Sequence, residues 1–208
     1  MTRPTAALLK PRKAPRQARS AVTIDAIQIA TIQVLLTDGA GRLTTTRVAE
    51  RAGVSIGTMY QYYPNKEALL FAVVERQLDR ITTVMLTAAR DLHGQDLATI
   101  ARGLTAAWFN VKGEDAVTSR AMYAIAAEFD LADLMSRSME QGMHAIGELL
   151  RSASDRRSLD PTSTALVLTA MLSGSVRVVM EIERAEEKLA CLRRELPLAC
   201  QAYLVAVN

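Results

Sequence analysis

The chain has 208 residues, half of them hydrophobic, which is enough for one sizeable core or for a small module joined to a larger one. Such a composition excludes a wholly disordered chain. The net charge of +3 divides unevenly, because residues 1–66 carry 10 Lys and Arg against 3 Asp and Glu (+7), whereas residues 67–208 carry 15 against 19 (−4). The N-terminal part is therefore suited to a polyanionic partner, which the remainder would repel.

The sequence predicts neither a secretory signal nor a membrane span. No apolar stretch follows the first basic residues. The most apolar run, 165–180, is shorter than a bilayer-spanning helix and contains Arg177. Two cysteines, Cys191 and Cys200, provide no disulfide framework and suit a reducing compartment. We therefore expect a soluble, cytoplasmic protein without a membrane partner.

Residues 1–19 contain three prolines and six basic side chains but no acidic one, which predicts a flexible basic arm. From Val22 onward, apolar residues recur at the spacing of one helix face. The pattern stops where Asp38 is followed by Gly39, a residue that adopts the left-handed conformation easily. We expect a first helix between these limits.

Two short helices joined at a glycine follow. Thr44 is a suitable N-cap for a helix over 45–52, which Gly53 ends. Ser55 is a suitable N-cap for the next helix, over 56–62. Pro64 then stops that helix, and a long helix is expected to begin at Asn65. This arrangement is that of a helix-turn-helix.

The second of these short helices has an outward face without an acidic residue. We expect Val48, Ala49, Val54 and Met59 to point inward, and Ala49 is small enough for the two helix axes to approach closely. A polar face without negative charge suits a groove lined by phosphates, although the surface of an ordinary helical hairpin has the same appearance. The outward or terminal residues are Ser55, Gly57, Thr58, Tyr60, Gln61 and Tyr62.

Residues 44–66 read TTTRVAERAGVSIGTMYQYYPNK and are followed by Glu67-Ala68-Leu69. Together with its flanks, over about residues 22–75, this segment resembles the N-terminal domain of the TetR family of regulators, whose pattern is AGVS-G-(T/L)YxYFxxKexL after a threonine-rich helix. Leu35 stands where the family often has an aromatic residue, and Tyr63 stands where it often has phenylalanine. Both keep an apolar body, so the expected fold is unchanged.

The resemblance implies that the helix over 56–62 enters the major groove of double-stranded DNA. Thr58 and Gln61 are then the expected base readers, since glutamine can bond adenine through two hydrogen bonds and a threonine methyl can meet thymine. Tyr60 and Tyr62 would reach phosphates through their hydroxyls.

Other residues of the segment would contact the DNA backbone. Ser55 and Gly57 would offer backbone N–H groups, and Lys66 resembles the family's phosphate-contacting lysine. The residues suited to the flanking backbone are Thr45, Thr46 and Arg47. The basic arm either lies along the minor groove or phosphates, or is a solvated tail; its candidate contacts are Arg12, Lys13, Arg16 and Arg19.

The remainder of the chain is also predicted to be helical, and no stretch shows sustained strand alternation. The expected fold is therefore all-α, with about nine helices. A helix-turn-helix DNA-binding domain over 20–66 is followed by a ligand-sensing and dimerisation domain over 67–208. The later helices are predicted near 96–110, 115–129, 131–154, 161–187 and 188–206.

The family resemblance implies a homodimer on a palindromic operator, paired through the last two helices at about 161–206; a monomer core is the alternative. Helices between 96 and 154 are expected to hold a small, largely apolar effector. The candidate residues, each of which also suits ordinary core filling, are Trp108, Met122, Tyr123, Phe129, Met139 and Met143, with Arg177 either binding an anionic group or bridging the dimer seam.

An enzyme is not expected, and neither is a cofactor or a metal site. His93 and His144 are far apart in sequence, and Cys191 and Cys200 fall on opposite faces of a straight helix. The predicted function is a transcription regulator, a repressor released from its operator by an effector. The alternatives are a dimeric DNA-binding regulator without a ligand, and a helical protein-interaction module that does not bind DNA.

Overall fold

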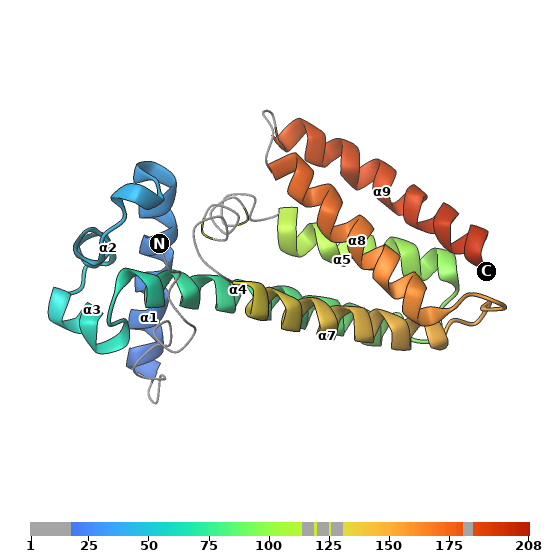
Figure 1. The fold of residues 1–208 in the computed structure, drawn as a ribbon, viewed down its shortest axis with the longest axis horizontal. Helices are drawn as coiled ribbons and strands as arrows, with labels where there is room; N and C mark the ends of the chain where they lie inside the picture. Colours follow the sequence, from blue (N-terminus) through green and yellow to red (C-terminus); the bar gives the residue numbers. More distant parts are fainter. Residues whose placement is uncertain (1–17, 114–118, 120–124, 126–130, 181–184) are drawn as a thin grey trace. The chain divides into compact units, whose positions relative to one another are not determined.

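The computed structural model describes residues 18–113, 119, 125, 131–180 and 185–208. All regular structure in these residues is helical, with eight α-helices, one short 3-10 helix and no strand (Figure 1). The all-α prediction is therefore confirmed. The described residues form two compact units, one built from 18–77 with Ser119, Ile125 and 131–133, the other from 78–113, 134–180 and 185–208.

In the first unit, α1 spans Ala18–Asp38 and begins earlier than the Val22 expected. Apolar spacing marks the buried face of a helix and not its first turn, which explains the difference. Ile27 and Val34 are buried on the predicted stripe. Gly39, at φ +79°, takes the left-handed conformation directly after the helix and leads into η2, Ala40–Arg42.

The helix pair α2, Thr45–Ala52, and α3, Ile56–Tyr62, has the predicted bounds. The Thr44 hydroxyl accepts the Arg47 N–H at 3.3 Å, and the Ser55 hydroxyl accepts the Thr58 N–H at 3.0 Å, so both caps are confirmed. Gly53 has a φ of +67°, where an L side chain would be strained. Of the residues expected to face inward, Val48, Ala49 and Met59 are buried, whereas Val54 is only half-buried.

The long helix α4 spans Lys66–Asp91. Asn65, predicted to be its first residue, is its cap instead: the Asn65 Oδ1 atom accepts the Ala68 N–H at 2.7 Å. A short polar side chain at this position competes with the helical backbone conformation, which is why asparagine favours the cap. The apolar stripe of α4 is buried from Ala68 through Met85.

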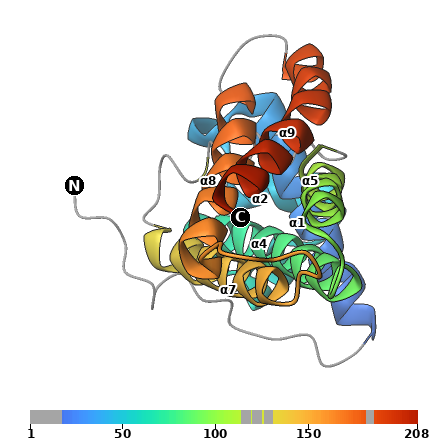
Figure 2. The ribbon, with the colours of Figure 1, turned by 90° about the vertical axis from the view of Figure 1, so that its right-hand side faces the viewer.

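The second unit contains α5, Leu97–Gly113, and most of α7, Ala132–Arg151. The later part of α4 lies beside α7 (Figures 1 and 2), and the Thr82 and Ser138 hydroxyls are 2.8 Å apart. The helix predicted over 115–129 lies outside the described residues, except that Ser119 and Ile125 are helical and buried.

The last two helices are α8, Pro161–Met180, and α9, Ala185–Val207. They pack against each other, and both contact α5 (Figure 2). The prediction that one helix covers 161–187 is wrong, because residues 185–187 belong to α9. Neither glycine nor proline marks this junction, so apolar spacing alone does not show where one helix ends.

Two segments of the described chain, Ser20–Asp38 and Pro161–Val179, match a membrane-spanning helix in length and hydropathy. Each has apolar residues packed in the core, α1 against α2 and α8 against α9. Core helices of soluble proteins have the same properties, so two such segments are weak evidence for a membrane span.

Candidate nucleic-acid interface

The outward surface of α2 and α3 carries the side chains proposed to meet DNA, and none of these residues is buried. Tyr60 is 45% exposed and Gln61 is exposed, while Thr58 and Tyr62 are half-buried. The sequence of α3 contains no acidic residue. The remaining predicted residues are exposed (Thr46, Arg47, Ser55, Gly57) or half-buried (Thr45, Lys66).

A hydrogen bond between hydroxyls joins the start of α2 to the middle of α3. The Tyr60 hydroxyl lies 3.2 Å from Thr45 Oγ1. The two side chains were predicted separately, and the fold brings them together on one surface. A phenol held in this way presents its hydroxyl in a fixed position, where it can also bond a phosphate oxygen.

The hydroxyl of Thr58 is used inside the protein. It lies 2.9 Å from the Ser55 hydroxyl, which also caps the helix through the Thr58 N–H. The methyl group of Thr58 is then the part of the side chain suited to a base contact. Gly57, next to these residues, is exposed, and a Cβ atom at its position would meet only Ser55 Oγ, at 3.8 Å.

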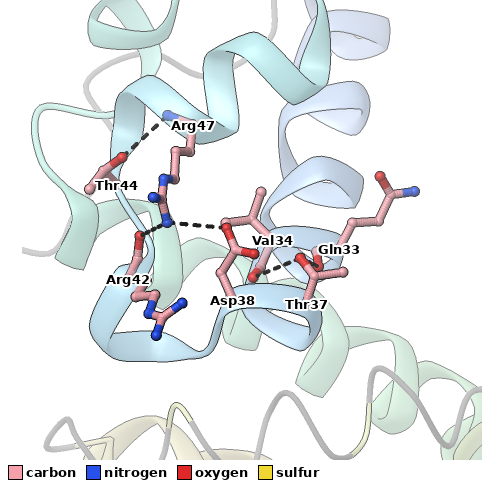
Figure 3. A network of polar contacts seen from close by, with 7 residues as sticks. All are labelled: Gln33, Val34, Thr37, Asp38, Arg42, Thr44 and Arg47. Atoms are coloured by element: carbon pink, nitrogen blue, oxygen red, sulfur yellow. Dashed lines mark hydrogen bonds and ion pairs between the residues drawn. The ribbon is translucent and has the colours of Figure 1, made fainter.

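Arg47 ties α2 to the end of α1 (Figure 3). Its Nη1 atom lies 3.2 Å from an Asp38 carboxylate oxygen and donates to the Arg42 carbonyl oxygen, also at 3.2 Å. Both side chains of the ion pair are more than a third exposed, so its contribution to stability is small. Arg47 therefore orients the start of α2, a role that the sequence did not indicate.

Two features of this unit were missed by the sequence analysis. Ile56, the first residue of α3, is 41% exposed on the same helix, whereas only polar and small residues were predicted at this surface. Tyr63 was expected to act only as an apolar residue. It is buried, and its hydroxyl accepts a hydrogen bond from Gln28 Nε2 at 3.1 Å. A buried tyrosine hydroxyl usually has a hydrogen-bond partner, which is the signal that could have found this contact.

The contact of Tyr63 is part of a network that joins three helices. Gln28 Oε1 accepts from Arg76 Nη1 at 2.7 Å, and Arg76 also pairs with the Asp25 carboxylate. Burial raises the pKa of the Tyr63 phenol above its ordinary value, so that the hydroxyl stays protonated. The network anchors the end of α3 against α1 and the first half of α4.

Of the candidate effector residues that the structure describes, one lines a hollow in the second unit. Met143 is half-buried and lines a hollow of about 420 Å³ with Gly147, Arg151 and Leu166, whereas Trp108 and Arg177 do not line it. Trp108 is half-buried on α5, while Met139 and Arg177 are exposed. Met122, Tyr123 and Phe129 lie outside the described residues.

Among the residues that the structure describes, no group of three or more His, Cys, Asp or Glu side chains could hold a metal ion. Cys191 is exposed and Cys200 is buried. Burial raises the pKa of the Cys200 thiol to about 11, so this thiol is not activated as a nucleophile.

Two short capped helices with a left-handed glycine between them, and an exposed face without acidic residues on the second helix, define a helix-turn-helix DNA-binding protein. Residues 29–73 match the family described as bacterial regulatory proteins, tetR family. Residues 96–204 match the tetracyclin repressor-like C-terminal domain. The chain belongs to the TetR family and is a DNA-binding transcription regulator.

Similar proteins agree with this assignment. The HTH-type transcriptional regulator EthR of Mycolicibacterium smegmatis is 27% identical over 151 residues, which cover 72% of this chain and 69% of that protein. The structure of a SmeT–triclosan complex is 25% identical, with a TM-score of 0.66, over 89% of this chain and 92% of that one. A putative TetR-family regulator from Mesorhizobium loti has the same fold, with 20% identity, a TM-score of 0.70 and coverage of 91% and 98%.

Proposed function

We propose that this regulator is a cytoplasmic, homodimeric repressor without enzymatic activity, which binds a palindromic operator and leaves it when a small molecule binds. The observation that carries the proposal is the exposed face of α3, which is anchored from behind by buried Met59 and Tyr63 and bears no negative charge. Such a face can lie in the major groove without repelling the phosphates on either side.

Within this proposal, the residues of α3 have different roles. Gln61 reads adenine through its amide, and the Thr58 methyl packs on thymine, since the Thr58 hydroxyl is bonded to Ser55. Exposed Ile56 is a second apolar group for a thymine methyl. The Tyr60 hydroxyl, positioned by Thr45, bonds a phosphate oxygen.

Backbone contacts complete the proposed interface. Lys66, in the first turn of α4, neutralises a phosphate, and Gly57 permits close approach of the protein backbone. Arg47 positions α2 through Asp38 and donates to DNA with its remaining N–H groups. The other proposed phosphate contacts are Thr46, Ser55 and Tyr62.

The dimer is proposed to form through α8 and α9, at about 161–206. These helices pack on each other and still expose apolar side chains that a second copy would cover. A two-fold dimer also places two α3 helices on half-sites about 34–36 Å apart, as a palindromic operator requires. The exposed apolar residues are Leu166, Val167, Val178, Leu198 and Val205.

Release by an effector is proposed to act through α4. This helix carries Lys66 near the DNA-binding face and continues to Asp91 in the unit where the effector is expected. A ligand that binds one position of α4 better than the other would change the separation of the two α3 helices. A solved structure of SmeT, a protein of similar fold, is a complex with triclosan, which supports a small organic ligand for this chain.

DNA binding is tested with an operator selected from a random duplex library by the purified full-length protein. Fluorescence anisotropy across salt concentrations then measures affinity for the selected and for a scrambled duplex. Lys66→Ala is expected to weaken binding to both duplexes and to reduce the slope of log affinity against log salt concentration by about 1. Gln61→Ala should instead relax the preference for one base at a single position of the operator.

The control for Gln61→Ala is Gln141→Ala, which truncates an exposed glutamine of α7 outside the proposed interface. It should bind like the wild type. Equal loss on every duplex for Gln61→Ala would refute its role as a base reader. Absence of any duplex selected at low salt would refute DNA binding and favour a protein-interaction module.

The dimer is tested with Leu198→Asp, at a residue of α9 that is 60% exposed and therefore tolerates a charge in the monomer. Sedimentation velocity should show a monomer for this variant and a dimer for the wild type. Leu86→Asp, at an exposed leucine of α4, is the control and should remain dimeric. A dimeric Leu198→Asp variant would contradict the proposed interface.

A further inference from the structure

The hollow lined by Met143 lies between α7 and the first turns of α8, inside the second unit. Its volume of about 420 Å³ falls in the range of roughly 300–1,000 Å³ in which proteins bind small organic ligands. Met143, Gly147 and Leu166 form its apolar wall. The other lining residues are polar and exposed, so a small molecule can enter from solvent and bury an apolar part: His144, Arg151, Asp160, Thr162 and Ser163.

The glycine in this wall is not required by the fold. Gly147 stands within α7, where glycine is less favourable than alanine, and it does not have the positive φ that favours glycine. A Cβ atom at this position would meet its nearest neighbours, Arg151, Pro161 and Ala165, at 3.7–3.9 Å, which are ordinary van der Waals distances. What the missing side chain provides is therefore space in the hollow.

The charged side chains that line the hollow have opposite signs, and each has a partner. Arg151 forms an ion pair with Glu148. The Asp160 carboxylate accepts the Thr162 and Ser163 N–H groups at 3.4 and 3.0 Å, and so caps α8. This lining favours an uncharged ligand, and the Thr162 and Ser163 hydroxyls offer hydrogen bonds to a polar group on it.

The wall of the hollow also connects to α4, the helix proposed to act in release. Met143 lies on α7, and the Ser138 hydroxyl of the same helix is 2.8 Å from the Thr82 hydroxyl of α4. A ligand between α7 and α8 would favour one separation of these two helices over another. A shift of α7 would then reach α4 through this contact.

We propose that this hollow binds the effector, and that the effector is an uncharged, largely apolar molecule with one hydrogen-bonding group. Its apolar body contacts Met143 and Leu166 against the Gly147 backbone, and its polar group bonds the Thr162 or Ser163 hydroxyl at the rim. The inference rests on the proposed effector-released regulator and adds the place and the chemistry of its ligand.

Two fluorescent probes that differ by one anionic group test the class of ligand. N-phenyl-1-naphthylamine is uncharged, and 1-anilinonaphthalene-8-sulfonate has the same aromatic body with a sulfonate. Each is titrated into the full-length wild type, and its emission reports binding. The wild type is expected to bind the uncharged probe more tightly. A preference for the sulfonate probe would contradict an uncharged ligand.

Two glycines of α7 provide a matched pair of variants that test the site. Gly147→Ala places a methyl group in the hollow and should weaken the uncharged probe about tenfold, the low end of the effect of one methylene in a binding pocket. Gly142 does not line the hollow, and a Cβ atom there would meet nothing within 4 Å, so Gly142→Ala should leave the affinity unchanged. Both variants should unfold at higher urea concentration than the wild type, which excludes loss of the fold as the cause.

Two methionines of the same helix provide a second pair. Met143→Ala removes part of the apolar wall and should weaken the uncharged probe several-fold, whereas Met139→Ala, at an exposed residue outside the hollow, should not. Leu86→Ala tests another hollow, of about 350 Å³ between α4 and α7, and should also leave the affinity unchanged. Equal affinities within either pair, or a loss for Leu86→Ala in place of Met143→Ala, would overturn the proposal.

Operator affinity is measured separately, with and without the uncharged probe. The probe is expected to weaken operator binding by the wild type and to do so less for Gly147→Ala. A protein that binds its operator but shows none of the effects of the α7 variants loses this inference and keeps the DNA-binding proposal. Probe binding in the hollow without any change in operator affinity would overturn its role as the effector site.

Discussion

The helix-turn-helix segment and the second unit differ in whether their buried polar groups have hydrogen-bond partners. Within residues 18–66, the two buried polar side chains are hydrogen bonded: Gln28 donates to the Tyr63 hydroxyl, and the Thr31 hydroxyl donates to the Ile27 carbonyl oxygen at 2.7 Å. In the second unit, by contrast, the Trp108 indole N–H and the Thr169 hydroxyl have no hydrogen-bond partner among the described residues.

This difference separates a segment whose buried polar side chains are hydrogen bonded from a unit in which two shielded groups lack partners among the described residues. A surface that reads DNA needs side chains held in fixed positions before the duplex arrives, and fully paired polar groups provide such rigidity. A sensing unit gains its response from polar groups that bind better in one state than in another. The same kind of substitution should therefore have opposite effects on stability in the two regions.

The largest effect is expected for Met59→Ala, because Met59 of α3 is fully buried. Loss of its side chain should lower the free energy of unfolding by about 2–5 kcal/mol and abolish operator binding. Urea unfolding followed by circular dichroism measures the first effect. Met139→Ala, at an exposed methionine, should stay within about 0.5 kcal/mol of the wild type. Similar losses in both variants would contradict the burial argument.

The next effect has the opposite sign. Lys112→Met should raise the free energy of unfolding at neutral pH by about 3–4 kcal/mol, the free energy that corresponds to a pKa lowered by burial from 10.5 to about 8. Trp108 fluorescence during urea unfolding reports this change in the second unit. A destabilised Lys112→Met variant, with Lys188→Met at an exposed lysine of α9 unchanged, would contradict the contrast between the two regions.

The pH dependence of this difference gives a second readout. Between about pH 8 and 10.5 the unfolded chain still holds the Lys112 proton that the folded chain has released, so the unfolded state binds more protons. The stability of the wild type should therefore rise with pH over this window relative to Lys112→Met, and the two should converge. A constant difference from pH 7 to pH 10 would exclude a depressed pKa at Lys112.

A smaller loss is expected for Tyr63→Phe, which removes one hydroxyl and leaves the Gln28 amide without that partner. The free energy of unfolding should fall by about 1–2 kcal/mol. Gln28→Leu together with Tyr63→Phe should recover part of the loss, since both polar partners are then removed. A double variant no more stable than Tyr63→Phe would contradict the pairing.

The smallest effect is expected for Asp38→Ala, which removes the exposed ion pair with Arg47. Stability should change by less than about 1 kcal/mol. If Arg47 both positions α2 and contacts phosphate, Arg47→Ala should weaken operator binding more than Asp38→Ala does. Anisotropy titrations with the selected operator measure both. Equal affinities for the two variants would restrict Arg47 to its structural role.

The sequence by itself determined the helix-turn-helix in detail. The bounds of α2 and α3 depend on Thr44, Gly53 and Ser55. The conformational preferences of these residues act within a few positions, so the local sequence is enough to predict them. The inward position of Met59 follows from helical spacing in the same way. The TetR resemblance in this segment also identified the protein class.

The tertiary structure decided what lies far apart along the chain. Gln28 and Tyr63 are separated by 35 residues, and no local pattern pairs them. The sequence shows Lys112 as an ordinary lysine near a helix end, and its burial depends on how the helices of the second unit pack. Apolar spacing predicts that one face of a helix is buried. It does not show which other helix covers that face, because the contacts between two helices depend on how both of them pack in the folded protein.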